Sequence, residues 1–217
     1  MRILVVGRGG REHAIVWSLS KSDKVKKIFC APGNAGIAQL AELVDLDEFA
    51  FDQLVQFALD NAIDLVVIGP DDPLAAGIVD AFEAAKIPVY GPRKNAAEIE
   101  GSKIFMKNLL KKYDIPTAKY ETFTDYESAL AYLRSQPVPI VVKADGLAAG
   151  KGVTVCFTRE EAEQALADTM VGKAFGAAGE KVVIEEFLEG QEMSILAFVD
   201  GETVRPMSPA ADHKPVF

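Results

Sequence analysis

Short apolar runs alternate with amphipathic segments along the first hundred residues. Aliphatic and β-branched residues fill five runs that predict strands, at 3–6, 27–31, 43–46, 64–68 and 88–90. Apolar residues at helical spacing lie between the strands and predict helices at 51–61, at about 74–85, and after Gly10, with Ala14, Ile15, Trp17 and Leu19 as an apolar face. Strands that alternate with helices are typical of α/β proteins with a parallel sheet covered on both faces.

Turn residues follow three of these predicted strands, in the loops Gly7–Gly10, Pro32–Gly36 and Gly69–Pro73. Ligands bind beyond the carboxyl ends of the strands in open α/β sheets, so we expect a ligand site among these loops. The first loop lacks the dinucleotide fingerprint G-x-G-x-x-G, because Glu12 occupies the position of the third glycine. It predicts an anion site at a helix N-terminus. A solvated first helical turn is the alternative interpretation of Arg11, Glu12 and His13, since an acidic residue is favoured there by the helix dipole.

In the second half of the chain, strand-type and helix-type patterns of apolar residues follow one another in a different order. It predicts a helix at 104–113, with Ser102 as its N-cap and Phe105, Leu109 and Leu110 as its apolar face. Strands are predicted at 120–123, 138–144, 153–155, 182–188 and 193–199, and helices at about 126–134 and about 159–170. Asp200-Gly201 predicts a two-residue hairpin that returns through 202–207. Much of this pattern indicates a small α+β unit of about 70 residues.

A glycine-rich loop follows the strand at 138–144. Lys143 ends that strand, and Gly146, Gly150 and Gly152 follow with Lys151 between the last two. Glycines let backbone N–H groups approach an anion closely, and the lysines add positive charge. The loop is not a P-loop, because three residues instead of four separate its first two glycines and no Ser or Thr follows Lys151. It predicts a lid over phosphates; the alternative is a hairpin whose glycines serve only the turn.

Composition narrows the possible partners. The formal charge is −9, spread evenly over the chain without a basic run, so we expect no nucleic-acid or membrane partner. Cys30 and Cys156 lie in apolar runs and predict buried free thiols without metal-type spacing. His13 and His213 are too few for a nitrogen-rich metal site. No apolar run is long enough to span a membrane, and a strand without a preceding signal peptide opens the sequence, so we expect a cytoplasmic protein.

The sequence KADGLAAGKGV at 143–153 resembles the nucleotide-binding loop of ATP-grasp enzymes. Together with VVGRGGREHA, APGNAG and VIGPDDPL, it resembles the glycinamide ribonucleotide synthetase (phosphoribosylamine–glycine ligase) family. The resemblance implies a parallel-sheet α/β substrate-binding domain over residues 1–100. It also implies a partial ATP-grasp domain over 101–217, made of an α+β lid at about 118–190 and the start of the ATP-grasp body.

The same resemblance implies ATP-dependent ligation of glycine to 5-phosphoribosylamine through a glycyl phosphate, giving glycinamide ribonucleotide, ADP and phosphate in purine biosynthesis. It covers all 217 residues but only about half of a family member. We therefore expect this stretch alone to be inactive and the intact enzyme to be a monomer. Mg²⁺ or Mn²⁺ is the implied metal, with ligands beyond residue 217, so no residue here is assigned as a metal ligand. Another ATP-grasp ligase or carboxylase, and a non-enzymatic nucleotide-binding module, are the alternative functions.

The resemblance also implies three groups of site residues. Those implied for the nucleotide are Lys103, Lys143, Gly146, Gly150, Lys151, Gly152, Glu185, Glu186, Phe187, Leu188 and Glu192. Those implied for phosphoribosylamine are Gly9, Gly10, Arg11, Glu12, His13, Asn34, Pro70 and Asp71. Those implied for catalysis are Lys143, Asp212, His213 and Lys214. The chain departs from the family at Asp71, where a Glu is usual, and at Ala211 and Pro215, where Gln and Arg are usual. Without the resemblance, Lys103 predicts a surface lysine and Glu185-Glu186 an acidic strand end.

Overall fold

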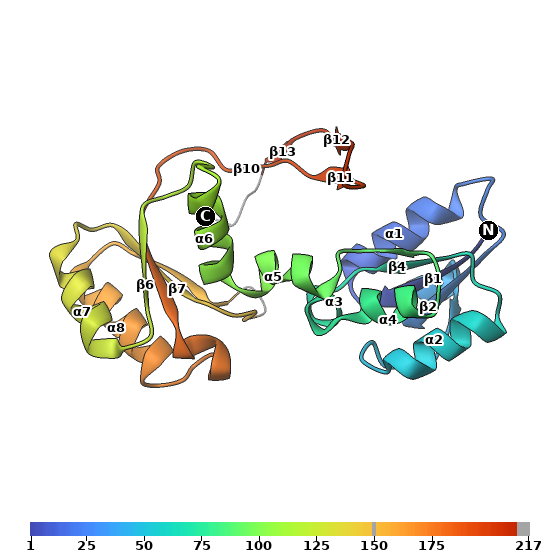
Figure 1. Ribbon diagram of the computed structural model, residues 1–217, viewed down its shortest axis with the longest axis horizontal. Coiled ribbons are helices and arrows are strands. Elements are labelled where there is room, and N and C mark those ends of the chain that lie inside the picture. The colour runs from blue at the N-terminus through green and yellow to red at the C-terminus, as the bar shows by residue number, and fades with distance from the viewer. Residues whose placement is uncertain (149–150, 212–217) are drawn as a thin grey trace.

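The computed structural model describes residues 1–148 and 151–211 (Figure 1). Two units, each built on its own β-sheet, lie at opposite ends of an elongated molecule. Helices α5 (Lys94–Gly101) and α6 (Lys103–Lys112) lie between them. None of the helices in the described ranges is long and apolar enough to cross a membrane.

The first unit is a parallel sheet in the order β3-β2-β1-β4-β5. Its strands are β1 (Arg2–Gly7), β2 (Lys27–Pro32), β3 (Glu42–Leu43), β4 (Leu65–Ile68) and β5 (Val89–Tyr90). Alternate residues of β1 enter two different cores, because successive side chains of a strand point to opposite faces. Leu4 and Val6 pack with helices α2 (Phe51–Asp60), α3 (Asp71–Ala76) and α4 (Ile78–Ala84), and Ile3 and Val5 pack with α1 (Gly10–Ser20). The predicted α/β class is confirmed.

The second unit is an antiparallel sheet in the order β6-β9-β7-β8. Its strands are β6 (Tyr120–Phe123), β7 (Ile140–Ala144), β8 (Val153–Cys156) and β9 (Val182–Glu186). Helices α7 (Tyr126–Ser135) and α8 (Arg159–Met170) pack on one face through Leu133, Leu166 and the alternate strand residues Ile140, Val142 and Ile184. The opposite face of β7 and β9 carries Val141, Lys143, Val183 and Glu185, and α6 lies on that side.

Two short antiparallel pairs follow the second sheet. One joins β10 (Met193–Ser194) to β13 (Ala210–Ala211), and the other joins β11 (Ala197–Val199) to β12 (Val204–Pro206). Two 3-10 turns complete the described elements, η1 (Ile37–Gln39) and η2 (Gly176–Glu180). All strand residues of these two pairs are exposed.

Four predicted elements differ from the structure. The predicted strand at 43–46 is reduced to Glu42–Leu43, and the predicted helix at 74–85 is two helices that meet at Gly77, whose φ of 104° interrupts the helical backbone. The predicted strand at 193–199 is divided into β10 and β11. The hairpin after β11 is present, but residues 200–203 form its loop, so the two-residue turn was wrong.

Helix α5 was not predicted, because Ala97 is its only buried residue and it carries no apolar stripe. The predicted apolar face of α1 is confirmed only in part, because Ile15 and Leu19 are half-buried and pack against the core. Trp17 is 53% exposed and Ala14 is exposed, whereas Val16 is fully buried. Cys30 and Cys156 are buried free thiols, as predicted.

Candidate functional site

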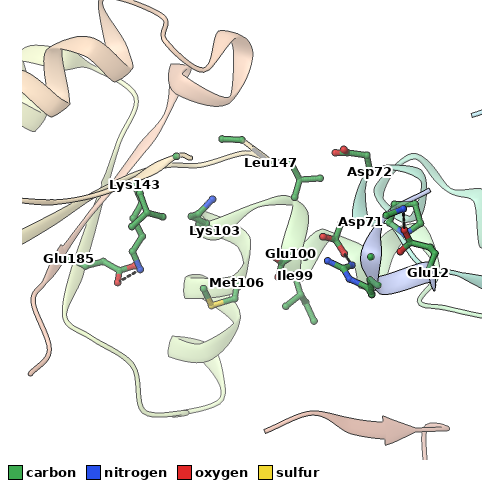
Figure 2. A pocket seen from close by; sticks show the side chains of 17 residues that line it. Glu12, Asp71, Asp72, Ile99, Glu100, Lys103, Met106, Lys143, Leu147 and Glu185 are labelled. Atoms are coloured by element: carbon green, nitrogen blue, oxygen red, sulfur yellow. Dashed lines mark hydrogen bonds and ion pairs between the residues drawn. The ribbon is translucent and has the colours of Figure 1, made fainter. Parts of the chain in front are cut away.

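A cleft of about 810 Å³ lies between the two units (Figure 2). Its walls come from the N-terminus of α1, the β4–α3 loop and the start of α3, helices α5 and α6, strand β7 and the loop after it, and strands β8 and β9. In Figure 2, Lys143, Glu185 and Lys103 lie on one side, and Glu12, Asp71 and Asp72 lie on the other. The cleft is therefore built from residues far apart in the sequence.

Glu12 shapes the wall that belongs to the first unit. Its side chain turns back to the start of α1, where Oε2 accepts a 2.6 Å hydrogen bond from the N–H of the N-cap residue Gly9. A Cβ added at Gly7 would lie 2.5 Å from Glu12 Cγ, and one added at Gly69 would lie 2.2 Å from Oε1. The carboxylate therefore occupies a space that glycines leave open. Glu12 is only 4% exposed, so the solvated-turn interpretation was wrong for this residue.

Two side chains fasten the three predicted loops to one another. Arg11 Nη1 donates to Gly69 O at 2.9 Å and to Asp71 Oδ1 at 3.1 Å. Asn34 Nδ2 donates to Arg8 O at 2.8 Å, and Asn34 Oδ1 accepts from the N–H groups that begin η1. The Arg11–Asp71 ion pair is largely exposed, so its contribution to stability is small, of order 0–1 kcal/mol.

Lys143 and Glu185 meet because of the register of the second sheet. Lys143 lies opposite Val183, and Glu185 lies opposite Val141, so the two charged residues are diagonal neighbours on one face. Lys143 Nζ donates to Glu185 Oε2 at 2.7 Å. Glu185 Oε1 lies 3.1 Å from Lys107 Nζ on α6 but accepts no hydrogen bond from the described residues. The cleft therefore has a buried carboxylate with unused acceptor capacity beside a lysine ammonium group.

The base of the glycine-rich loop is attached to the N-terminus of α6. Asp145 Oδ1 accepts from Ile104 N at 2.8 Å and from Ser102 Oγ at 3.0 Å, and Ser102 Oγ accepts from Phe105 N as the predicted N-cap. Lys103 Nζ donates to Gly146 O at 3.1 Å. These contacts place Lys103 beside Lys143 at one end of the cleft.

Two groups near the cleft have shifted pKa values. Burial lowers the pKa of Lys103, and the charge of Lys143 acts in the same direction, while Asp145 and Glu100 oppose the shift. Burial, with a smaller effect of the Glu12 charge, raises the pKa of Cys30 to about 12. Lys103 is therefore a less basic ammonium group than a free lysine, and Cys30 is an inert thiol.

The cleft collects ten of the predicted site residues: Gly9, Gly10, Arg11, Glu12, Pro70, Asp71, Lys103, Lys143, Gly152 and Glu185. Other predicted residues do not line it: His13, Asn34, Gly146, Lys151, Glu186, Phe187, Leu188 and Glu192. Of these, His13 lies against Gly36, and Glu186 Oε1 accepts from Lys119 N at 2.8 Å. The predicted residues Gly150, Asp212, His213 and Lys214 lie outside the described residues.

Sequence reasoning missed two residues that hold the site together, Asp145 and Lys107. Asp145 is part of the KADG motif, and its position directly after the strand could have indicated a helix-capping carboxylate. Lys107 gave one signal, its i+4 spacing from Lys103, which places both lysines on one face of α6. Asp72, Ile99, Glu100 and Met106 also line the cleft without having been predicted.

No group of three or more His, Cys, Asp or Glu side chains that could hold a metal ion occurs within residues 1–148 and 151–211. The described residues therefore do not by themselves fit a divalent-cation site.

Comparisons with known proteins agree along the whole chain. Residues 1–100 match the phosphoribosylglycinamide synthetase N domain, and residues 101–217 match the phosphoribosylglycinamide synthetase ATP-grasp (A) domain. The chain is 54% identical to the phosphoribosylamine–glycine ligase of Halalkalibacterium halodurans over 217 residues, which is 100% of this chain and 51% of that protein. It thus spans about half the length of the curated relatives it matches.

Solved structures show the same relationship. The crystal structure of phosphoribosylamine–glycine ligase from Thermotoga maritima matches with a TM-score of 0.80 and 31% identity, covering 96% of this chain and 49% of that one. The biotin carboxylase domain of the Hydrogenobacter thermophilus 2-oxoglutarate carboxylase matches with a TM-score of 0.73 over 97% of this chain and 49% of that one. Its identity is 20%, so this likeness concerns the fold alone. By its sequence and its fold, the chain belongs to the phosphoribosylglycinamide synthetase family.

Proposed function

We propose that this chain supplies the nucleotide lid and the phosphoribosylamine-binding face of an ATP-dependent ligase. The reaction joins glycine to 5-phosphoribosylamine and yields glycinamide ribonucleotide, ADP and phosphate, a step of purine biosynthesis. The proposal rests on the family membership and on one observation: a single cleft is lined by Lys103 and Lys143 at one end and by the N-terminus of α1 at the other.

The lysine end of the cleft suits the phosphates of ATP. Two ammonium groups from different elements converge there, beside a glycine-rich loop whose backbone can approach an anion. The resemblance implies that the Glu185 carboxylate accepts from the exocyclic amine of adenine. Each of its oxygens is ion-paired with a lysine but keeps a further lone pair for such a bond. The backbone of Glu186 and Leu188, which follow directly along the chain, would contact the edge of the base.

The chemistry needs positioning and charge stabilisation more than a nucleophilic side chain. A carboxylate oxygen of glycine attacks the γ-phosphorus, the bond to the β-phosphate oxygen breaks, and ADP leaves. Lys103 and Lys143 stabilise negative charge on the transferring oxygens. The amine of phosphoribosylamine then attacks the glycyl carbonyl carbon, phosphate leaves, and the nitrogen loses a proton. Water would hydrolyse the acyl phosphate, so a lid that closes the cleft protects it.

The opposite end of the cleft suits the second substrate. Gly9 and Gly10 present the N-terminus of an eleven-residue helix, which favours a phosphate group. The carboxylate of Asp71, which lines this end of the cleft, would accept hydrogen bonds from ribose hydroxyls or from the amine. Phosphate transfer from ATP uses a divalent cation, Mg²⁺ or Mn²⁺. We propose that residues outside the described ranges hold it with the nucleotide.

For the enzyme as a whole we propose a cytoplasmic monomer with small-molecule substrates. The evenly spread negative charge of this chain supports the small-molecule partners, because it offers no basic run for nucleic acid or anionic lipid.

The test is a product assay on the whole gene product. ADP release should require both glycine and freshly generated 5-phosphoribosylamine, and mass spectrometry should detect glycinamide ribonucleotide. Lys143→Met should lower turnover by more than tenfold. Activity with another carboxylate in preference to glycine would indicate a different ATP-grasp ligase. Nucleotide binding without any ligation would indicate a binding module.

A further inference from the structure

Lys107 is a buried lysine that does not line the cleft. Its side chain is 3% exposed, and its Nζ lies 3.1 Å from Glu185 Oε1. Nζ also donates to Thr117 Oγ1 at 2.7 Å and to Ala118 O at 3.5 Å, and it lies 5.1 Å from the centre of the Tyr120 ring. Two neutral oxygen acceptors, a carboxylate and an aromatic face therefore surround the ammonium group.

Burying a lysine at this position is costly. Removing an ammonium group from water costs several kcal/mol before its partners repay any of it. A Leu or Met on the same face of α6 would pack against the sheet at no such cost. Packing alone therefore does not explain Lys107, and its charge is the property to account for.

The charge acts through a shared carboxylate. Glu185 holds Lys143 through Oε2 at 2.7 Å and faces Lys107 through Oε1 at 3.1 Å. Two formal positive charges thus share one negative charge. Without Lys107, Lys143 and Glu185 would form a neutral pair. With it, the cluster carries a net charge of +1, and Lys143 is its cationic member that lines the cleft.

We infer that Lys107 is a positioning residue for the proposed nucleotide site: it balances Glu185 from behind, so that the ammonium group of Lys143 stays available to ligand phosphates. The inference rests on the proposed function. Lys107 also fixes the orientation of Glu185, whose carboxylate is held between Lys107 and Lys143.

A purely structural role is the competing explanation, because Lys107 also anchors α6 to the segment before β6 through Thr117 and Ala118. The two roles differ in what they do to ligands of different charge. Loss of an anchor would weaken adenosine and ATP alike. Loss of the balancing charge would weaken ATP most, ADP less and adenosine least, because electrostatic interaction grows with ligand charge.

The experiment compares the affinities of ATP, ADP and adenosine, measured by equilibrium titration on the whole gene product. We expect Lys107→Met to weaken ATP roughly tenfold to hundredfold and adenosine by no more than about threefold, because close buried charges couple strongly. Lys107→Arg should retain most of the ATP affinity, because it keeps the charge. Lys111→Met removes an exposed lysine of the same helix and should bind like the wild type.

The double variant Lys107→Met with Glu185→Gln is the decisive control. It removes both buried charges together, so no buried carboxylate is left to neutralise Lys143 and no lone charge hinders folding. Glu185→Gln also keeps a side-chain oxygen that can accept from the adenine amine, so the proposed contact with the base is not removed by the control. We expect its ATP affinity to recover toward the wild type relative to Lys107→Met.

Equal losses for adenosine and ATP, or a double variant no better than the single one, would overturn the inference and leave the proposed function standing. A wild-type protein that binds none of the three ligands would overturn both.

Discussion

The Glu12 side chain fills a space that Gly7 and Gly69 leave open, which we call the Glu12 seat. This contact gives the sharpest prediction about stability. Gly69→Ala would place a Cβ 2.2 Å from Glu12 Oε1, 2.5 Å from Cγ and 2.6 Å from Cδ. A Cβ and a non-bonded heavy atom cannot lie this close together, so the Glu12 side chain must leave its seat. Its hydrogen bond from Gly9 N at 2.6 Å would then be lost. We expect Gly69→Ala to destabilise the first unit.

The magnitude follows from two opposing effects. A hydrogen bond to a charged group contributes about 1.5–3 kcal/mol, and loss of a helix cap costs about 0.5–2 kcal/mol; these describe the same contact and are not added. Replacing Gly by Ala offsets about 0.4–1 kcal/mol by restricting the unfolded chain. The expected net loss in the free energy of unfolding is therefore about 1–2 kcal/mol.

The assay is urea unfolding followed by tryptophan fluorescence. Trp17 is the only tryptophan of the chain and lies on α1, so its signal reports the unit that contains Glu12. Gly10→Ala is the matched control, because a Cβ at Gly10 meets nothing within 4 Å. It should be neutral or slightly stabilising.

A double-mutant cycle decides whether the contact is the cause. In a Glu12→Ala background the seat is empty, so Gly69→Ala should cost nothing further or stabilise slightly. If Gly69→Ala costs as much in that background as in the wild type, the reasoning about the Glu12 seat is refuted.

Three further predictions concern groups around the cleft. Asp145→Ala removes the acceptor of Ile104 N and Ser102 Oγ, so circular dichroism during urea unfolding should show a loss of about 1–3 kcal/mol; an unchanged midpoint would contradict this. The lowered pKa of Lys103 means that ATP affinity should fall, as pH rises, earlier than an ordinary lysine would allow. Lys103→Arg, which stays charged, should remove this fall in ATP affinity. Identical pH profiles of ATP affinity for the wild type and Lys103→Arg would count against the prediction. The pKa of Cys30 is raised from 9.0 to about 12, so its stabilising contribution is complete below pH 9 and lost as pH rises toward 12. Native Cys30 should resist alkylation at pH 8, and rapid labelling without unfolding would disprove the burial.

Local patterns were enough to predict most of the architecture. The β-branched runs at 3–6 and 140–142 are buried strands in the structure, and helix α8 begins and ends at the predicted residues. The spacing of apolar residues along an element indicates which of its faces are buried, and each of these segments is buried on one face or on both. Helix α5 has almost no buried face, so its sequence carries no such signal.

The site could be predicted only in part, because it depends on long-range neighbours. Glu12 is buried because Gly69, distant in the sequence, leaves space for its carboxylate. Lys107 is buried because the register of β7 and β9 brings Glu185 beneath α6. Neither a register nor a space left by a glycine is visible in a local pattern. Family resemblance supplied Lys143 and Glu185, but it did not indicate that a second lysine shares the carboxylate.

The central claim is that the phosphates of ATP bind between Lys103 and Lys143. Quantitative lysine acetylation, read by mass spectrometry with and without Mg²⁺ and ATP, tests it directly. The account predicts that ATP protects Lys103 and Lys143 from modification and leaves the exposed lysines Lys111 and Lys112 unchanged. Unchanged modification of Lys103 and Lys143 at saturating ATP would place the nucleotide elsewhere and contradict the account.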